Sequence, residues 1–408
     1  MINRWWVLFL AGAAVAGAWL SEPLLTLAGM LGLLVGGAEL LWTRHCLTGV
    51  EYERRLGAAR AAWGDDVSLT VRVTNRKLLP LTWLQVEDQV PARLTIERAA
   101  ITHGPRQSLA YLSSLLSMLP YEQVVRRYRV RCRQRGLFEF GPSRLVSGDL
   151  LGRTSRSAGD ERVDRLIVYP KLLDLIVPPP RSRRMVGRRA ADRLIVTDPS
   201  RTIGVRRYQA GDPLRHVEWR ASARSPELLV RVFEPTTDLA LAVFLDFLVP
   251  GFGTDNLYPD ELELTISVAA SLARWALDRR FRVGLVGNGT GQGPDGVRVP
   301  VGDGPEQLRR ILEALALATP FAWQRTPIAR LLASEAPRMP YEASVAVVTA
   351  KLDEEVLAAA TAVGRRRPVT VLHVRPPGSP EVRVAGLDVV TVPYEPGWDE
   401  LERLSLAA

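Results

Sequence analysis

Two long apolar stretches at the amino terminus constrain this chain more than any other feature. The first runs from Trp5 to Leu20 and the second from Leu24 to Trp42, and Glu39 is the only charged residue in either. As helices they would be roughly 24 and 28 Å long at about 1.5 Å per residue, close to the ~30 Å hydrocarbon core of a bilayer. Residues 1–45 are therefore expected to form a transmembrane helical hairpin.

A cleaved signal peptide is the alternative interpretation, because Ala16-Gly17-Ala18 resembles a cleavage site. The second apolar run favours the hairpin, since a signal peptide is not normally followed at once by another spanning segment. The short turn between the runs carries only Glu22, whereas arginines lie on both outer sides, at Arg4, Arg44, Arg54, Arg55 and Arg60. The positive-inside rule then places both termini on the cytoplasmic side of the cell membrane.

The small numbers of lysines and cysteines exclude a Walker-type nucleotide site, a disulfide framework and a four-cysteine zinc site. The net charge is +9, from 53 Lys+Arg against 44 Asp+Glu. The lysines are only Lys77, Lys171 and Lys351, and none of them follows a glycine. A Walker-type phosphate loop needs a Gly-Lys pair, so this chain cannot hydrolyse a nucleotide by such a loop. The two cysteines, Cys46 and Cys132, are too few for a disulfide framework or a four-cysteine zinc site.

From residue 46 to residue 177 the hydrophobic pattern has the two-residue period of strands. Val67–Thr74 and Trp83–Val90 alternate apolar and polar residues, and each is followed by a turn signal or a proline. Several short strands separated by turns predict an antiparallel β-sandwich. Cys132 falls on the apolar side of its strand and is expected to be an ordinary core residue.

Arginine occupies every second position from Arg127 to Arg135, which predicts a row of arginines on one strand face. The row is either a surface for anionic lipid or nucleic acid, or the solvated outer face of the sandwich, which we favour. Pro178–Pro180 and the arginines between Arg181 and Arg189 follow. Their composition is typical of an extended linker, with contact to anionic lipid as the alternative. Nucleic acid is not expected as a partner.

After residue 238, strand-like and helix-like runs alternate. Leu239–Phe247 is an apolar run typical of a strand buried on both faces, and residues 261–279 have apolar positions at helical spacing. The alternation predicts further strands at 281–286, 344–348, 369–374 and 389–392, and further helices at 305–317 and 353–363. Residues 238–408 are therefore expected to form an α/β domain with a doubly wound parallel sheet.

The segment 178–237 joins the two regions and contains a dense motif of charged, aromatic and small residues. The motif consists of Arg206, Tyr208, Gly211, Asp212, Arg215, Glu218, Trp219, Ser222, Ala223 and Arg224. It resembles the signature of the bacterial family called domain of unknown function 58. Two stretches before it, 135–152 and 168–170, and the apolar pair at the amino terminus also resemble the usual layout of that family.

This resemblance implies a von Willebrand factor A-like fold for residues 238–408 and a membrane anchor at the amino terminus. It also implies a protein partner, a MoxR-type AAA+ ATPase that acts as a chaperone in the assembly or maturation of other proteins. Two roles stay open for the signature. It is either a packed ion-pair lattice with Trp219 as its hydrophobic plug, or a docking surface on which arginine and tryptophan anchor a partner.

Von Willebrand A-like domains often hold Mg²⁺ through an Asp-x-Ser-x-Ser sequence, whose oxygen ligands suit a hard cation. The corresponding residues here are Asp246, Leu248 and Pro250, so the aspartate remains but both hydroxyls are lost. A later strand end, which often supplies another carboxylate, reads Thr349-Ala350-Lys351, with Asp353 slightly beyond. The sequence therefore predicts a degenerate site that binds no metal.

Other motif matches are weak. Gly291–Gly296 spells a dinucleotide pattern but leads into a strand-like run, so no helix amino terminus would face a pyrophosphate. The four histidines, His45, His103, His216 and His373, include no pair with metal-ligand spacing. We therefore expect a cofactor-free, non-catalytic membrane adaptor. The alternatives are a peripheral binder of anionic lipid or nucleic acid, and a Mg²⁺-dependent von Willebrand A-like binding domain.

Overall fold

The computed structural model describes residues 5–104, 109–149, 155–176, 197–209, 217–235, 240–248, 260–291, 296–320, 326–340, 343–378, 382–384 and 386–406. The chain divides into two compact units, Met1–Val168 and Tyr169–Ala408. Each has its own sheets and its own buried core. We call them the amino-terminal unit and the carboxy-terminal unit.

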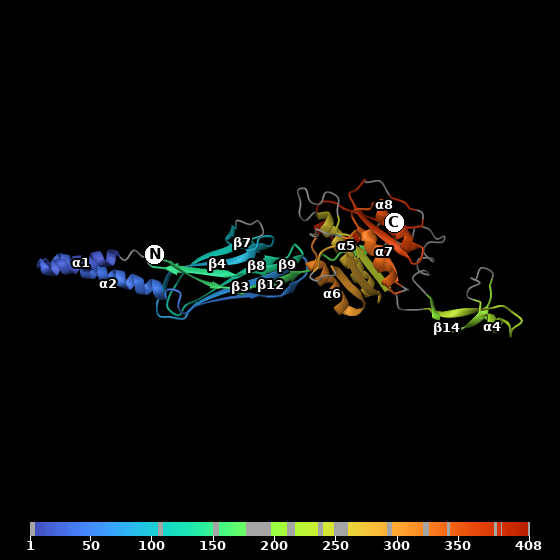
Figure 1. The fold of residues 1–408 in the computed structure, drawn as a ribbon, viewed down its shortest axis with the longest axis horizontal. Helices are drawn as coiled ribbons and strands as arrows, with labels where there is room; N and C mark the ends of the chain where they lie inside the picture. Colours follow the sequence, from blue (N-terminus) through green and yellow to red (C-terminus); the bar gives the residue numbers. More distant parts are fainter. Residues whose placement is uncertain are drawn as a thin grey trace. The chain divides into compact units, whose positions relative to one another are not determined.

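Two helices open the amino-terminal unit, α1 (Trp5–Trp19) and α2 (Pro23–His45) (Figure 1). They are joined by a tight turn in which Ser21 adopts a φ of 55°. By length and composition α2 is able to cross a membrane, whereas the apolar part of α1, Val7–Trp19, is shorter. The prediction of an apolar segment able to span a membrane is thus confirmed for α2.

Glycines bring α1 and α2 into close contact. A Cβ atom on Gly17 would lie 2.5 Å from the backbone nitrogen of Thr26, and one on Gly29 would lie 2.6 Å from that of Ala14. Such distances are too short for a real Cβ, so a larger residue at either position would force the helices apart. Close approach through small residues is the usual way in which helices associate in lipid.

The rest of the amino-terminal unit is β structure (Figure 1). Two antiparallel sheets have the orders β1-β3-β8-β5 and β11-β10-β4-β7-β6, and a small third sheet has the order β2-β12-β9. The strands are β1 (Val50–Leu56), β2 (Arg60–Ala61), β3 (Asp66–Asn75), β4 (Leu81–Pro91), β5 (Thr95–Glu97), β6 (Ile101–His103), β7 (Leu109–Met118), β8 (Gln123–Arg131), β9 (Gly136–Phe140), β10 (Ser143–Gly148), β11 (Ser155–Asp160) and β12 (Asp164–Val168). Alternate residues of both large sheets are buried in one core, which also contains Cys132, as predicted.

One buried arginine on β1 ties the three sheets of this unit together. The side chain of Arg54 is 3% exposed and forms an ion pair with Asp88 on β4. Its other nitrogens donate to Asp164 Oδ2 on β12 at 2.8 Å and to the carbonyl of Arg162 at 2.8 Å. The hydroxyl of Tyr52 donates to the second oxygen of Asp88 at 2.6 Å. A charge buried this deeply is stable only with such a full set of partners.

The row of arginines on β8 is shorter than the sequence predicts. The strand ends at Arg131, where the next backbone N–H, that of Cys132, donates instead to the carbonyl of Asp65 at 3.0 Å. Arg133 lies beyond the strand, and Arg135 is only 5% exposed. The prediction of one continuous face from 127 to 135 is therefore wrong, because the alternation in the sequence continues after the chain has left the sheet.

The carboxy-terminal unit is built on a six-stranded sheet with the order β18-β17-β16-β19-β20-β21. All neighbours are parallel except β17 and β18. The strands are β16 (Ala240–Leu245), β17 (Arg282–Gly287), β18 (Val297–Gly302), β19 (Ala343–Thr349), β20 (Val369–Arg375) and β21 (Asp388–Pro393). Numbered along the chain, the order is 3-2-1-4-5-6, with β16 as the first strand.

Helices cover both faces of this sheet. They are α5 (Asp260–Asp278), α6 (Gly304–Leu317), α7 (Ile328–Glu335) and α8 (Glu354–Gly364), with the 3-10 helices η2 (Ala336–Arg338) and η3 (Trp398–Glu400). Val243 on β16 belongs to the core cluster that contains α5 and α6, whereas its neighbour Phe244 belongs to the cluster with α7 and α8. Because alternate strand residues face opposite sides, the central strands β16, β17 and β19 are buried on both faces, as their continuous apolar sequences predict.

Two small β pairs complete this unit. β13 (Asp174–Ile176) pairs in parallel with β22 (Arg403–Ser405). β14 (Thr197–Arg207) pairs antiparallel with β15 (Leu229–Pro235), and the short helix α4 (Trp219–Ser222) lies between these two strands in sequence. The predicted linker residues 178–196 lie outside the described residues.

Candidate functional site

The strand order of the carboxy-terminal unit defines one place where a ligand or a partner is expected. From β16 the chain crosses to β17 on one side, and later returns through β19 on the other side. In open α/β sheets the carboxyl ends of strands at such a switch point line the usual binding crevice. Asp246 follows β16 and Thr349 ends β19, so both predicted positions of the degenerate metal site lie here.

Asp246 is 2% exposed and is held by hydrogen bonds to both carboxylate oxygens. Its Oδ1 accepts from the backbone N–H of Leu248 at 3.0 Å and from the side-chain amide of Asn288 at 2.7 Å. Its Oδ2 accepts from the hydroxyl of Thr349 at 3.0 Å. Asn288 follows β17, and its Oδ1 accepts from the N–H of Phe247 at 2.7 Å. The aspartate thus links the ends of three neighbouring strands.

Burial dominates the electrostatics of this site. It raises the pKa of Asp246, and the hydrogen bonds from Leu248, Asn288 and Thr349 oppose that shift. Lys351 lies nearby, with its Nζ 3.7 Å from Asp353 Oδ2. A carboxylate with both oxygens engaged in this way acts as a structural link between strand ends.

The ligands for a cation are sparse at this position. Leu248 carries a hydrocarbon side chain where a hydroxyl would serve a metal, and Pro250 lies outside the described residues. Within the described residues, no group of three or more His, Cys, Asp or Glu side chains is arranged to hold a metal ion. That the site binds no metal stays a prediction. Asn288 also belongs to the site. The sequence did not reveal it, because a single asparagine forms no motif with the other residues of the site.

The signature segment forms a second candidate site, on β14, α4 and β15. Ser222 is its central link. Its hydroxyl accepts from the N–H of Leu229 at 2.9 Å and donates to the carbonyl of Glu218 at 2.9 Å. The N–H of Glu218 in turn donates to the carbonyl of Leu229 at 2.9 Å. α4 is therefore fastened to the start of β15 by both side-chain and backbone hydrogen bonds.

One charged residue of the signature, Glu218, pairs with a residue outside the motif. It forms an ion pair with Arg231 on β15. The sequence contained one signal that could have identified Arg231 as a surface residue. Apolar and polar residues alternate along β15, and this alternation places Arg231 on an exposed side of the strand. Among the residues that the structure describes, Arg224 has no ion-pair partner, and it is exposed. Gly211, Asp212 and Arg215 lie outside the described residues.

Trp219 does not act as a plug. It is 64% exposed, whereas a residue that filled the centre of a packed lattice would be buried. Tyr208 is 36% exposed, and its N–H donates to the carbonyl of Leu228 at 2.8 Å, next to the start of β15. The segment therefore combines a braced backbone with an exposed indole and an exposed guanidinium on or beside α4.

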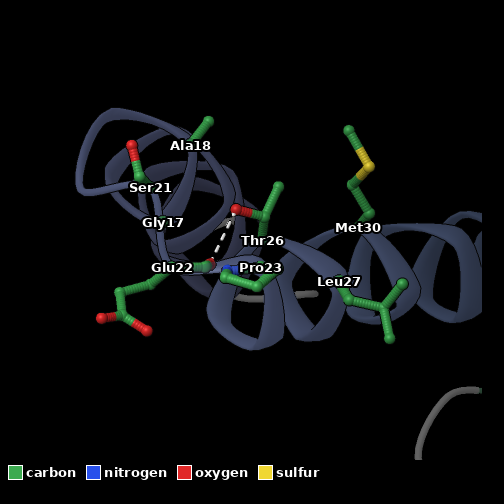
Figure 2. Close-up of a pocket in the computed structure, with 8 residues that line it drawn as sticks. All are labelled: Gly17, Ala18, Ser21, Glu22, Pro23, Thr26, Leu27 and Met30. Atoms are coloured by element: carbon green, nitrogen blue, oxygen red, sulfur yellow. Dashed lines mark hydrogen bonds between the residues drawn. The ribbon is translucent and has the colours of Figure 1, made fainter.

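A shallow pocket also lies at the tip of the helix pair. Figure 2 shows the residues that line it, which are Gly17, Ala18, Ser21, Glu22, Pro23, Thr26, Leu27 and Met30. Its main polar contact is internal, since the hydroxyl of Thr26 donates to the carbonyl of Glu22 at 3.1 Å. These residues form the turn between two apolar helices, and we assign the pocket no chemistry.

The arginine face of β8 is partly neutralised. Arg129 lies 3.7 Å from Asp66, and Arg131 forms an ion pair with Glu97. Opposite charges across neighbouring strands are the usual arrangement on the solvated face of a sheet. This arrangement favours the solvated-face interpretation over a binding surface for lipid or nucleic acid.

Comparison with known proteins places the signature in a family. Residues 204–398 match the family described as "Protein of unknown function DUF58". The uncharacterized protein YeaD of Bacillus subtilis (strain 168) is 24% identical over 351 residues, which cover 86% of this chain and 79% of YeaD.

Among solved structures, the CARDB domain of the PF1109 protein from Pyrococcus furiosus is 14% identical, with 29% of this chain and 91% of that domain covered and a TM-score of 0.19. Spo0M, a sporulation control protein from Bacillus subtilis, is also 14% identical, with 29% of this chain and 49% of that protein covered and a TM-score of 0.17. Scores this low support no inference. The family match includes both the signature and the six-stranded sheet, and together with the similarity to YeaD it supports the DUF58 family for this chain.

Proposed function

We propose that this protein is a membrane-anchored adaptor without catalytic activity of its own. In this proposal α1 and α2 form a transmembrane hairpin, and both termini lie in the cytoplasm. The apolar length of α2 and the glycine-mediated contact between the helices support the anchor. Arg44 in the last turn of α2 and the arginines that follow the helix, such as Arg54, support the orientation.

The proposed fold of the carboxy-terminal unit is von Willebrand factor A-like. The strand order 3-2-1-4-5-6 with an antiparallel third strand supports this assignment. The alternative of a Mg²⁺-dependent binding domain is disfavoured by the hydrogen bonds that Asp246 accepts on both oxygens. The same geometry gives no reason to propose an enzyme, because the most deeply buried acid at the switch point is already engaged.

The proposed partner is a MoxR-type AAA+ ATPase, which would supply the nucleotide hydrolysis that this chain cannot perform through a Walker loop. The observation that carries the adaptor role is the exposure of Trp219 on a braced segment. Tryptophan and arginine are the side chains that most often dominate binding energy at protein interfaces. An indole that is 64% exposed and held by its own backbone framework is suited to such a role.

Binding of a purified MoxR-type ATPase to the full-length chain in detergent tests this proposal. We expect Trp219→Ala and Arg224→Ala each to weaken binding about tenfold or more, which corresponds to roughly 1.4 kcal/mol or more. Leu401→Ala and Arg310→Ala are matched controls, since both side chains are exposed and neither belongs to the signature. Affinities would be measured by biolayer interferometry with ATP, with ADP and without nucleotide.

Two results would contradict the proposal. One is that no MoxR-type ATPase binds the wild-type chain in any nucleotide state. The other is that the signature variants bind as tightly as the controls. Circular dichroism of each variant separates a lost contact from a lost fold, and Ser222→Ala is expected to disturb the segment itself.

A further inference from the structure

One end of the β-sandwich is fastened directly to the end of α2. Strands β1, β3 and β8 meet there, because Val50 pairs with Asn75 and Thr74 pairs with Gln123. The opposing sheet has the same end at Leu81, which pairs with Met118. The residues that cap this end are therefore the β3–β4 turn, residues 76–80, and the β7–β8 turn, residues 119–122. We call these two turns the proximal turns.

Lys77 connects the proximal turns to the helix. Its Nζ donates to the carbonyls of His45 and Thr48, each at 3.0 Å, and to that of Cys46. A cation at a helix carboxyl terminus is favourable because it satisfies free carbonyls and opposes the negative end of the helix dipole. The guanidinium of Arg156 also donates to the carbonyl of Arg44 at 3.3 Å. The proximal turns thus lie within hydrogen-bonding distance of the point where α2 ends.

The two proximal turns are joined to each other as well. The side-chain amide of Asn75 donates to the carbonyls of Leu79 at 3.1 Å and Leu119 at 2.9 Å. The N–H of Tyr121 donates to the carbonyl of Lys77 at 3.4 Å. Asn75 is itself fully buried, so this contact is part of the fold. The turns therefore present their outer side chains as one surface.

The outer surface of the proximal turns carries large exposed apolar side chains, which is unusual for the tip of a β-sandwich. Leu78 is 75% exposed, Leu119 is 69% exposed and Tyr121 is 68% exposed. Turn tips normally carry small or polar residues, since an exposed leucine there gains nothing from water. The same end of the unit is basic, because Arg44, Arg76, Lys77 and Arg156 outnumber the carboxylates Glu51 and Glu122 there. An apolar centre with a basic rim is the pattern of surfaces that bind membrane interfaces.

We propose that the proximal turns insert into the headgroup layer of the bilayer that α2 spans. Leu78, Leu119 and Tyr121 enter the interface, and the surrounding cations contact anionic phospholipid headgroups. The occupant follows from continuity: the apolar part of α2 ends at Trp42, and Lys77 holds the turns to the residues that come directly after it. This inference rests on the proposed membrane anchor and is independent of the ATPase partner.

Depth-dependent fluorescence quenching of the full-length chain in liposomes tests the proposal. An environment-sensitive fluorophore is attached at Leu78→Cys, Leu119→Cys or Leu137→Cys, and nitroxide lipids with headgroup labels serve as quenchers. Leu137 on β9 is the matched control, because it is an exposed leucine at the opposite end of the sandwich. The ten-residue strand β3 places the two ends roughly 30 Å apart at about 3.3 Å per residue. Cys46 and Cys132 are both buried, and the unsubstituted chain measures their background labelling.

We expect quenching at Leu78→Cys and Leu119→Cys to exceed that at Leu137→Cys at least about twofold, with a blue-shifted emission, because the interface is less polar than water. We also expect quenching at both turns to fall when phosphatidylglycerol is replaced by phosphatidylcholine. Equal quenching at the turns and at Leu137→Cys would overturn the proposal. Equal quenching in the two lipid mixtures would overturn its electrostatic part.

A label at Leu34→Cys in α2 separates failure of this inference from failure of the anchor. Leu34 is 69% exposed, and a spanning α2 places it among the acyl chains. Quenching at Leu34→Cys by acyl-labelled lipid, together with none at the turns, would refute only the inserted turns. No quenching at Leu34→Cys would refute the membrane anchor and the inserted turns together.

Discussion

At the scale of single residues, Asp246 shows how a familiar position can change its role. The acid stays where a metal ligand would be expected, but its oxygens accept from Leu248, Asn288 and Thr349. Three donors aimed at one carboxylate are costly to leave without an acceptor. The hydrogen bonds therefore give Asp246 a structural role, since it joins the ends of three strands.

Asp246→Ala is expected to destabilise the carboxy-terminal unit by roughly 2–4 kcal/mol, because it leaves buried donors unsatisfied. Chemical denaturation followed by circular dichroism measures this change. Asp353→Ala is the control, with a smaller effect expected from the loss of one helix cap, about 1 kcal/mol. Isothermal titration calorimetry of the wild-type chain with Mg²⁺ is expected to show no binding. Binding that disappears in Asp246→Ala would contradict the degenerate-site prediction.

The pH dependence of this residue follows from its raised pKa. An acid whose pKa is higher in the folded state binds more protons there than in the unfolded chain. Its burial therefore reduces stability as the pH rises from the unfolded value, about 3.9, through the folded value. At a pH below the unfolded pKa this loss of stability is absent, and at a pH above the folded pKa it has its full size.

At the scale of elements, the contact between α1 and α2 depends on single glycines. A Cβ on Gly29 would lie 2.6 Å from the backbone nitrogen of Ala14, whereas a Cβ on Gly37 has nothing within 4 Å. Gly29→Val is therefore expected to lower the stability of the helix pair by about 1–3 kcal/mol, because overpacking pushes the helices apart. Gly37→Val makes the same change of side chain without the clash and should be nearly neutral.

Thermal denaturation of both variants in detergent micelles provides the measurement. Similar losses in the two variants would mean that the helices do not pack through Gly29. Smaller losses for Gly29→Val than for Gly37→Val would exclude the observed helix contact altogether.

Sequence periodicity predicted the regular helices and strands well. It failed where a single contact determines the end of a strand or the partner of a charged residue. The strands of the six-stranded sheet were predictable because residues such as Val243 and Phe244 lie in continuous apolar runs. The end of β8 was not predictable, since the alternation continues through Arg135 after the hydrogen bonds have stopped. The partner of Glu218 was missed because alternation places Arg231 on the exposed side of β15 but does not show that it pairs with a residue 13 positions away.

At the scale of the whole molecule, the orientation in the membrane is the property with the sharpest test. The proposed anchor places residue 408 in the cytoplasm, because the basic residues flank the outer sides of both apolar runs. A green fluorescent protein fused after Ala408 is expected to fluoresce, and alkaline phosphatase at the same position is expected to be inactive. A fusion after Ser21, in the turn between the helices, should give the opposite pair of results. Active phosphatase at Ala408 would reverse the assigned orientation.

The strand order also has a consequence for synthesis. Of the six strands, β16 is synthesised first, but it lies in the middle of the sheet. The hydrogen bond between Asp246 and Thr349 can form only after a further 103 residues have been synthesised. Such distant pairs close slowly, and a ribosome adds only about 5–20 residues per second. The first strand therefore emerges several seconds before its second neighbour exists, at a time when α2 has long since left the ribosome. The nascent sheet would therefore be completed only once β19 has been made, and the apolar strand β16 would lack that neighbour until then.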